Sequence, residues 1–421
     1  MQHVNDDNPF DFDVIVIGGG SAGIAAAVGA AQSGATVCLV ERYGFLGGAA
    51  TISSVLTHCG FFDQRKEQVV KGVGQQLLDR FSQRDVYQTQ TMEESGNTVV
   101  LLDMETTKSV FDELVAEAGI TLYLHSQLIS AETHDGIITS VEFAHRAGST
   151  VLRAKTFIDA SGDGALIHAA GAAARLSDLV ERQASTLVIR IGGVEEGADL
   201  SPSGMRRAVE KYSEKTGVEL VRTSGIAVRM PVTREVMLLL ADQHRDVLDV
   251  AELTRAEIEA RQLSWHYLAA FRDSYAGWAS SFLAATGPQI GIREARRLHG
   301  LDEVTSDDVT EGRKREDDAI ARCGWPMENH VAPGITEYGG IRNKGWYHIP
   351  YGAICSSTHD NLWAGGRLVS SDNRAYASLR VMGTSFATGH ACGVAAAVYA
   401  EAGAHDLPET RRRLEEQRAL I

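Results

Sequence analysis

Short apolar runs and a small-residue helical pattern alternate in the first forty residues. Residues 14–17 are continuously apolar, an alanine-rich segment covers residues 24–33, and a second strand-like run covers residues 36–40. A continuous apolar run is typical of a parallel strand that is buried on both faces. The pattern therefore predicts a β-α-β unit, which is the first half of a doubly wound α/β sheet.

The chain then continues with two helical patterns and a series of short strands. We expect helices over residues 68–84 and 106–118, and strands over residues 121–125, 127–132, 137–145, 150–154 and 156–160. Alternation in the first four of these strands favours an antiparallel meander beside the parallel sheet. The strand 156–160 ends in a second glycine turn at residues 161–164.

The pattern changes between residues 186 and 340, where charged helices replace glycine turns. We expect helices over residues 203–217, 232–245 and 254–276, and strands over residues 187–191 and 218–229. The first pattern returns with a strand and glycine turn at 362–366 and a small-residue helix at 384–402. A chain of 421 residues exceeds the size of a single core. We predict a Rossmann-like domain, with a central parallel sheet plus an antiparallel meander, over residues 10–185 and 341–421, interrupted by an inserted α+β substrate domain over residues 186–340.

A glycine-rich turn separates the first strand from the first helix. Gly18 allows a tight turn, Gly20 lacks the side chain that would block a pyrophosphate, and Gly23 allows close packing of helix on strand. The phosphate would be bound by unpaired N–H groups at the positive end of the helix dipole. Glu41 follows the second strand at the spacing of an acid that binds ribose hydroxyls. The turn therefore predicts a dinucleotide site.

The segment after Glu41 distinguishes between NAD(P) and FAD. Residues 42–51 form a second loop rich in small residues, which an NAD protein does not need and which suits the longer FAD molecule. Here the chain resembles the FAD-dependent oxidoreductases of the glutathione reductase-like superfamily, and more narrowly a bacterial family with a C-terminal glycine-arginine motif. The blocks that carry the narrower resemblance are residues 103–105 with Lys108, 157–164, 291–297, 346–351, 361–367 and 379–382.

The resemblance implies FAD as the cofactor and a position for each part of it. Gly18, Gly20, Ser21, Ala22 and Gly23 would hold the pyrophosphate, Glu41 and Arg42 the adenosine ribose, Leu128 the adenine, and Ser161 and Gly162 the adenine side of the site. Gly47, Gly48, Ala49 and Thr51 would lie along the flavin, Gly366 and Arg367 near the ribityl and phosphate groups, and Met382, Gly383 and Thr384 at a helix N-terminus that faces the flavin. A helix dipole there would stabilise negative charge on reduced flavin.

Four residues are candidates for the chemistry beside the flavin. His348 is the first choice for a proton acceptor, although a structural histidine bonded to backbone is an equally good interpretation. His58 is the second choice, and His330 is a comparable alternative. Arg293 has the helical spacing to share a face with Arg297, so it would bind a substrate carboxylate or belong to an internal ion-pair network.

Composition and charge limit the partners of the chain. The formal net charge is -15, which argues against nucleic acid or an anionic membrane surface as the main partner. No apolar run has the length of a membrane span, and residues 1–13 are polar and acidic, unlike a signal peptide. We therefore expect a cytoplasmic protein with a small-molecule substrate. The sequence does not determine the oligomeric state.

The cysteines argue against a metal or iron-sulfur centre. The five cysteines are scattered and form no C-x-x-C pair. The leading hypothesis is an FAD-dependent oxidoreductase that transfers hydride between a small organic substrate and noncovalently bound FAD. One alternative is a flavin-dependent monooxygenase or halogenase, because residues 345–350, Gly-Trp-Tyr-His-Ile-Pro, are similar to the G-W-x-x-x-I-P pattern of halogenases, with one position fewer. The other alternative is an electron-transfer flavoprotein without an organic substrate.

Overall fold

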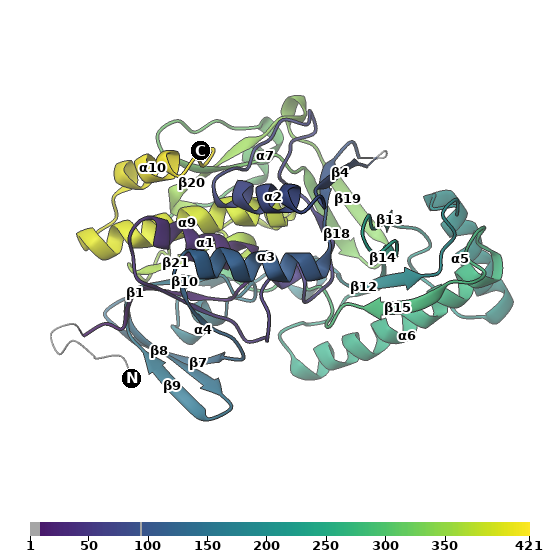
Figure 1. Ribbon diagram of the computed structural model, residues 1–421, viewed down its shortest axis with the longest axis horizontal. Helices are drawn as coiled ribbons and strands as arrows, with labels where there is room; N and C mark the ends of the chain where they lie inside the picture. Colours follow the sequence, from purple (N-terminus) through teal and green to yellow (C-terminus); the bar gives the residue numbers. More distant parts are fainter. Residues whose placement is uncertain (1–8, 93–94) are drawn as a thin grey trace.

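A five-stranded parallel sheet lies at the centre of the main body of the protein (Figure 1). The computed structural model describes residues 9–92 and 95–421. The strand order is β21-β10-β1-β2-β6, and all neighbours in it are parallel. The strands are β1 (Phe12–Ile17), β2 (Val37–Val40), β6 (Thr121–Tyr123), β10 (Ala154–Asp159) and β21 (Leu362–Ala364). The predicted α/β class and the strands near residues 14–17 and 36–40 are confirmed.

Side chains of β1 pack alternately into two hydrophobic cores. Val14 and Val16 contact the core that contains the helices α1 (Ser21–Gln32), α3 (Met104–Glu117) and α9 (Met382–Ala402). Ile15 and Ile17 face the opposite core, together with residues of an antiparallel meander. The continuous apolar run of β1 is therefore explained by burial on both faces of the sheet.

The meander consists of β7 (Gln127–His134), β8 (Ile137–His145) and β9 (Gly148–Leu152). Three of the four strands predicted for it belong to it. The prediction for the fourth, 121–125, is wrong, because β6 pairs in parallel with β2 at the edge of the central sheet. This strand follows α3 and returns to the sheet edge, as the crossover of a β-α-β unit does.

A second sheet lies beside the main body, with the order β13-β14-β12-β15. It consists of β12 (Ser185–Gly192), β13 (Ala227–Arg229), β14 (Val236–Gln243) and β15 (Phe282–Thr286), and two helices, α5 (Pro202–Thr216) and α6 (Val250–Ser274), accompany it (Figure 1). The helix predicted over 232–245 is wrong. Val236, Leu238 and Leu240 pack into a separate core beside this sheet, which we call the second core. Met237 packs into the core that contains α1, α3 and α9, which we call the first core, so this apolar run alternates between two cores as a strand does.

The strand predicted over 218–229 is confirmed only at its end, in β13. The predicted helices at 203–217 and 254–276 agree with α5 and α6 within a few residues. The second core is built from residues between Leu187 and Ile292, whereas residues 304–354 contribute to the first core. The domain bounds 10–185, 186–340 and 341–421 stay predictions.

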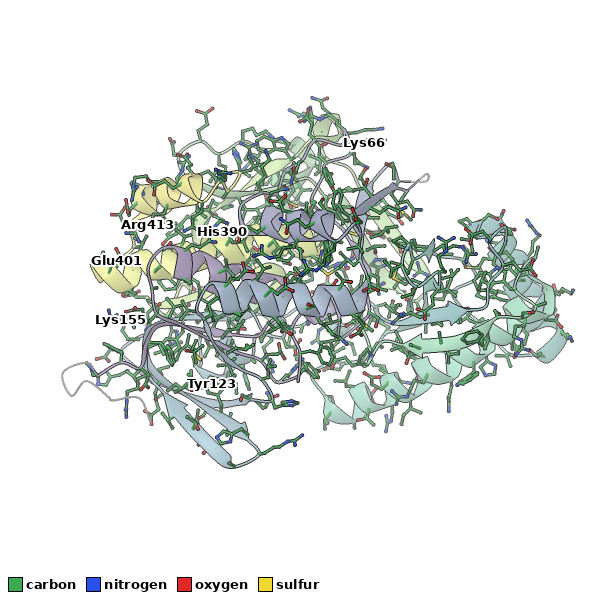
Figure 2. The ribbon with its side chains drawn as sticks, viewed as in Figure 1. Lys66, Tyr123, Lys155, His390, Glu401 and Arg413 are labelled. Atoms are coloured by element: carbon green, nitrogen blue, oxygen red, sulfur yellow. The ribbon has the colours of Figure 1, made fainter. Side chains whose placement is uncertain are left out.

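Shorter elements complete the chain. They are β3 (Thr57–His58), α2 (Val73–Gln83), β4 (Gln88–Thr91), β5 (Thr98–Leu101), α4 (Ala165–Ala169), β11 (Ala174–Arg175), β16 (Arg297–Leu298), α7 (Ser306–Glu311), β17 (Ala319–Cys323), β18 (Met327–Ala332), β19 (Ile335–Gly339), β20 (Tyr347–Pro350), α8 (Asn373–Leu379) and α10 (Leu407–Glu416). Arg413 of α10 pairs with Glu401 of α9 at 2.7 Å, which ties the C-terminal helix to the main body (Figure 2).

No single helix of the described residues is long and apolar enough to cross a bilayer, although α8 and α9, bent by 94° at their junction, pass that test together by length and composition. The α9 helix is mostly buried in the protein core. Residues 1–8, which carry part of the N-terminal interpretation, lie outside the described residues.

Two glycines of α9 allow it to pack directly on the backbone of α1. A Cβ atom on Gly389 would collide with the carbonyl oxygen of Ala22, and one on Gly393 with that of Ala26. Both helices are built largely from alanine and glycine, so their axes approach closely. This contact positions the N-termini of α1 and α9 relative to each other.

We predict that Gly393→Ala destabilises the protein, although alanine favours a helix. The added methyl group would overpack the helix contact, which typically costs about 1–3 kcal/mol of unfolding free energy. Urea denaturation would measure this change. Gly197→Ala is the control, because a Cβ there meets nothing within 4 Å. An equally stable Gly393→Ala protein would contradict the close packing of α1 and α9.

Candidate active site

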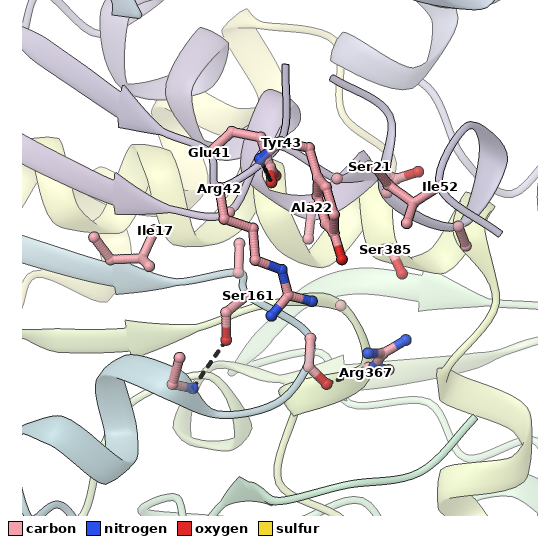
Figure 3. A pocket seen from close by; sticks show the side chains of 18 of the residues that line it. Ile17, Ser21, Ala22, Glu41, Arg42, Tyr43, Ile52, Ser161, Arg367 and Ser385 are labelled. Atoms are coloured by element: carbon pink, nitrogen blue, oxygen red, sulfur yellow. Dashed lines mark hydrogen bonds between the residues drawn. The ribbon is translucent and has the colours of Figure 1, made fainter. Parts of the chain in front are cut away.

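A deep cleft opens at the carboxyl ends of β1, β2, β10 and β21 (Figure 3). The empty volume within its lining, which includes open solvent, is about 1030 Å³. Residues of the main body and of the segment after the second sheet line it. In open α/β sheets, ligands bind at the carboxyl edge where connections leave in opposite directions. The lining of the cleft extends from Glu41 at the end of β2 to Met382 at the start of α9, as an extended ligand would require.

The glycine turn between β1 and α1 forms one wall of the cleft. Gly18 has a φ of +100°, and a Cβ there would lie 2.6 Å from the carbonyl oxygen of Ala160. A Cβ on Gly23 would collide with the carbonyl oxygen of Gly18. A Cβ on Gly20, in contrast, would meet only the backbone of Gly48 at 3.6 Å. The first and third glycines are thus required by the protein itself, whereas Gly20 leaves space free in the cleft.

The N-terminus of α1 offers unpaired donors to that space. Within residues 9–92 and 95–421, no side chain caps this helix, and no acidic residue lies in its first turn. The hydroxyl of Ser21, which lines the cleft, is buried without a hydrogen-bond partner in the same residues. Free N–H groups and the helix dipole together favour an anion at this position.

Glu41 holds two segments of the cleft wall together. Its carboxylate oxygens accept hydrogen bonds from the backbone N–H groups of Gly19, at 2.7 Å, and Tyr43, at 2.9 Å. Burial raises the pKa of Glu41, and these hydrogen bonds oppose the rise. The side chain therefore lies at the carboxyl end of β2, in the position expected for a ribose-binding acid.

Arg42 and Arg367 both line the cleft (Figure 3), and both pair with the carboxylate of Asp163. Asp163 pairs with Arg42 at 3.2 Å and with Arg367 at 2.7 Å. Arg367 also donates to the carbonyl oxygens of Gly162 and Ile292. Because these contacts use its donors, Arg367 joins the turn after β10 to the segment after the second sheet.

The N-terminus of α9 closes the other end of the cleft. Val381 is its N-cap, and no side chain of the described residues caps the helix. Met382 and Ser385 line the cleft, whereas the N–H of Gly383 donates to the carbonyl oxygen of Cys59 at 2.7 Å. A second uncapped helix thus directs its positive end toward the same region.

Most of the residues predicted to bind the cofactor line this one cleft. They are Gly18, Gly20, Ser21, Ala22, Glu41, Arg42, Gly48, Ala49, Leu128, Ser161, Gly162, Gly366, Arg367 and Met382. The remaining predicted residues, Gly23, Gly47, Thr51, Gly383 and Thr384, lie behind the lining and support its turns. Thr51, for example, donates to the carbonyl oxygen of Leu46 at 2.7 Å.

His58 does not line the cleft. It is fully buried between the rings of Phe61 and Phe386, whose centroids lie 6.1 and 6.0 Å from its own. Neither ring nitrogen has a partner among the described residues, and burial lowers its pKa to about 3. His58 is therefore a neutral core residue in this structure.

His348 also lies outside the cleft, on β20. Its Nδ1 atom accepts the backbone N–H of Arg315 at 2.8 Å. Burial and the charges of Arg322 and Lys314 lower its pKa to about 4. Its neighbour Trp346 lies beneath those same two cations, at 4.3 and 3.3 Å from its ring centroid. The segment that resembled a halogenase spacing is thus not brought to the cleft.

Arg293 directly follows the lining residue Ile292, and Arg380 itself lines the cleft. The sequence allows Arg380 either a structural role or the binding of an anionic substrate near the flavin. The motifs did not predict Tyr43, Ile52, Ser53 and Gln289 as lining residues. Their only sequence signal is that each lies close to a glycine-rich turn. Their residue types do not indicate a cofactor site, because these residues contribute to the shape of the cleft and to the hydrogen bond between Tyr43 and Gln289.

Comparison with known proteins assigns the class. A family model described as FAD dependent oxidoreductase matches residues 13–417. The chain therefore belongs to this family, and it is an FAD-dependent oxidoreductase. No curated protein matched the sequence. All five cysteines are free, and the described residues contain no group of His, Cys, Asp and Glu that could hold a metal.

Solved structures are similar to this chain at low sequence identity. BexE, studied for oxidation during BE-7585A biosynthesis, is 12% identical with a TM-score of 0.50, over 97% of this chain and 66% of its own. A geranylgeranyl bacteriochlorophyll reductase-like protein from Thermoplasma acidophilum is 14% identical with a TM-score of 0.49, over 97% and 84%. p-Nitrophenol 4-monooxygenase PnpA from Pseudomonas putida DLL-E4 is 11% identical with a TM-score of 0.48, over 96% and 84%.

We predict that stability falls as the pH drops below about 6.5, because three buried histidines resist protonation. Burial lowers the pKa of His58 to about 3, and those of His348 and His390 to about 4. The unfolded chain binds protons in this window and the folded chain does not, so each group costs about 2 kcal/mol of stability at pH 5. His58→Phe should make the unfolding free energy less pH-dependent by that amount.

Denaturant titrations at pH 7.5 and pH 5 would measure the effect. His134→Gln is the control, because that side chain is 79% exposed. If His58→Phe and the parent protein lost equal stability between the two pH values, His58 would not be a buried neutral histidine.

Proposed function

We propose that the cleft binds FAD noncovalently, through the residues described above, and that hydride equivalents pass between the cofactor and a small organic molecule. When bound, FAD supplies the capacity to accept or release two electrons together with a proton. The observation that carries the proposal is the uncapped N-terminus of α1, with the unpartnered Ser21 hydroxyl beside it. A pyrophosphate would satisfy these donors.

The residues of the chain also fit the rest of an extended FAD molecule. Glu41, already fixed by two backbone N–H groups, would accept from ribose hydroxyls. Leu128 with Ser126 and Gln127 would border the adenine. Gly48 and Ala49 would lie along the flavin, and the positive end of α9 would stabilise charge on its reduced form. This assignment of residues to the ribose, adenine and flavin parts of FAD supports a glutathione reductase-like arrangement.

The substrate would approach from the side of the second sheet. Gln289 and Ile292, which follow that sheet, line the cleft together with Ile52 and Ser53 of the main body. Such a cover would exclude water from the reacting centre. Neither His348 nor His58 lies there, so neither is part of the proposed site. Arg293 is retained as a substrate-binding residue.

The test is direct: the purified chain should be yellow and should contain one FAD per protein. Under anaerobic conditions, one member of a panel of alcohols, amines, acids and enones should bleach the flavin, or reoxidise it after chemical reduction. A colourless protein that takes up no FAD would refute the proposal. A yellow protein that exchanges electrons only with a partner flavoprotein or iron-sulfur protein would favour the electron-transfer alternative.

We predict that Gly20→Ala lowers FAD affinity at least tenfold without destabilising the chain. The backbone of Gly20, at φ -80° and ψ -174°, accepts any residue, and the new Cβ makes only an ordinary contact. It would occupy space next to the α1 amides, where the pyrophosphate is proposed to lie. Fluorescence titration of the protein after removal of FAD would measure the affinity, and thermal unfolding the stability.

Gly18→Ala is the comparison variant. Its positive φ and its 2.6 Å clash with Ala160 predict loss of both stability and binding. A Gly20→Ala protein with unchanged FAD affinity would argue against a pyrophosphate at the start of α1.

A further inference from the structure

Two largely buried arginines, Arg293 and Arg380, contact one short segment of chain at the edge of the cleft. Arg380 lines the cleft, and its Nε atom donates to the side-chain oxygen of Gln183 at 2.9 Å. Arg293 donates to the backbone oxygen of Ala184, the residue that follows Gln183. Because both guanidinium groups bond to consecutive residues, they face the same short segment of chain. We call this pair the two-arginine site.

Neither guanidinium has a carboxylate of its own. In the described part of the chain, no carboxylate lies within 4 Å of Arg380, and the nearest to Arg293 is Asp242 at 4.0 Å. Asp242 is already bound to Arg222 at 2.6 Å and accepts the hydroxyl of Thr186. Asp242 is therefore shared between Arg293 and Arg222, and Glu328 is another carboxylate whose charge acts on both arginines of the pair. Three guanidinium groups thus face two carboxylates, which leaves the two-arginine site with an excess of positive charge.

The pKa values of the basic groups at this site are lowered. Burial lowers the pKa of Arg293 to about 10, with a contribution from the charge of Arg380. The pKa of Arg380 is also lowered by burial. The neighbouring His330 has a pKa well below its usual value, because of its burial and the charges of both arginines and Arg222. Buried positive charge without a counter-ion is unfavourable, and a bound anion would remove the cost.

Each arginine also keeps donors for such an anion. Arg380 uses Nε for Gln183 and one terminal nitrogen for the backbone oxygen of Glu328 at 2.9 Å, and its other terminal nitrogen has no partner in the described residues. Arg293 uses only one terminal nitrogen, for Ala184. The planar guanidinium group matches a carboxylate in a two-pronged contact.

We propose that Arg293 and Arg380 bind a carboxylate of the substrate, so that the enzyme acts on a small organic acid. This inference rests on the proposed function, because it places the acid beside the proposed flavin site. The charge imbalance and the free donors are the observations that carry it. The pyrophosphate is not needed to explain them, since the α1 amides are available for that group.

The test measures binding of carboxylates by the FAD-containing protein. Acetate, benzoate, pyruvate and succinate would be titrated by calorimetry and by the change in flavin absorbance, with acetamide and benzamide as neutral counterparts. At least one acid should bind tenfold or more tightly than a neutral amide of similar size. Arg293→Gln and Arg380→Gln should each weaken that binding at least tenfold, and lysine at either position should give an intermediate affinity.

Arg190→Gln is the matched control. Arg190 is also buried but pairs with Glu235 at 2.8 Å and does not line the cleft, so its loss should leave carboxylate affinity unchanged. Flavin content and thermal unfolding would show that each variant is folded. Should a glutamine variant fail to fold, the lysine variant decides, since unchanged affinity in it would speak against a two-pronged contact.

Several results would overturn the inference. One is equal affinity for acids and amides, and another is unchanged carboxylate binding in both glutamine variants. A third is loss of FAD, rather than of carboxylate, in Arg380→Gln, which would make Arg380 a cofactor contact. If the parent protein bound no FAD, the proposed function would fail, while calorimetry with the same acids would still test the two-arginine site.

Discussion

The close approach of backbone to backbone around α1 is the constraint on which the rest of the structure depends. Gly18 and Gly23 bring the start of this helix against β1 and β10, and Gly389 and Gly393 bring α9 against its other side. Side chains at these positions would push the layers apart. Because the layers meet without side chains, two helix N-termini open into one cleft, and free N–H groups are concentrated where a dinucleotide would lie.

Charge is distributed unevenly around this cleft. At the end formed by the turn after β10, Arg42 and Arg367 are both paired with Asp163, so their charges are partly balanced within the protein. At the end near the second core, Arg293 has only Asp242 at 4.0 Å, which Arg222 already binds, and Arg380 has no carboxylate within 4 Å in the described residues. The arginines that pair with Asp163 stabilise the wall of the cleft, whereas the arginines with excess positive charge are available to bind an anionic ligand. Burial alone does not separate the two cases; the position of the nearest carboxylate does.

The accuracy of the sequence interpretation differed between elements for a physical reason. The glycine turn was predicted correctly because its residues are required by local geometry, as the positive φ of Gly18 and the clash of a Cβ on Gly23 with the carbonyl oxygen of Gly18 show. The run 236–243 was misread as a helix because it packs against two cores, and a strand buried on both faces has no polar side to reveal its period. The segment 121–125 looked like part of the meander, but its partner is β2, a choice made by distant residues.

The candidate histidines show the same limit at the site itself. His58 and His348 occur in conspicuous motifs, yet one is enclosed by Phe61 and Phe386 and the other is held by the backbone of Arg315. Which buried polar group faces a cleft depends on how strands far apart in sequence pack. Motif spacing contains no information about that packing.

The sequence by itself determined the β-α-β unit, the glycine turn and the acid at the end of β2, because each depends on contacts within about thirty residues. It also determined the cofactor class, through blocks that a family shares. Only the tertiary structure decided which arginines are paired and which are not, because Asp163, Asp242 and the segment 183–184 come from different parts of the chain. The net charge of a buried site is a sum over neighbours in space, and the order of residues along the chain does not specify those neighbours.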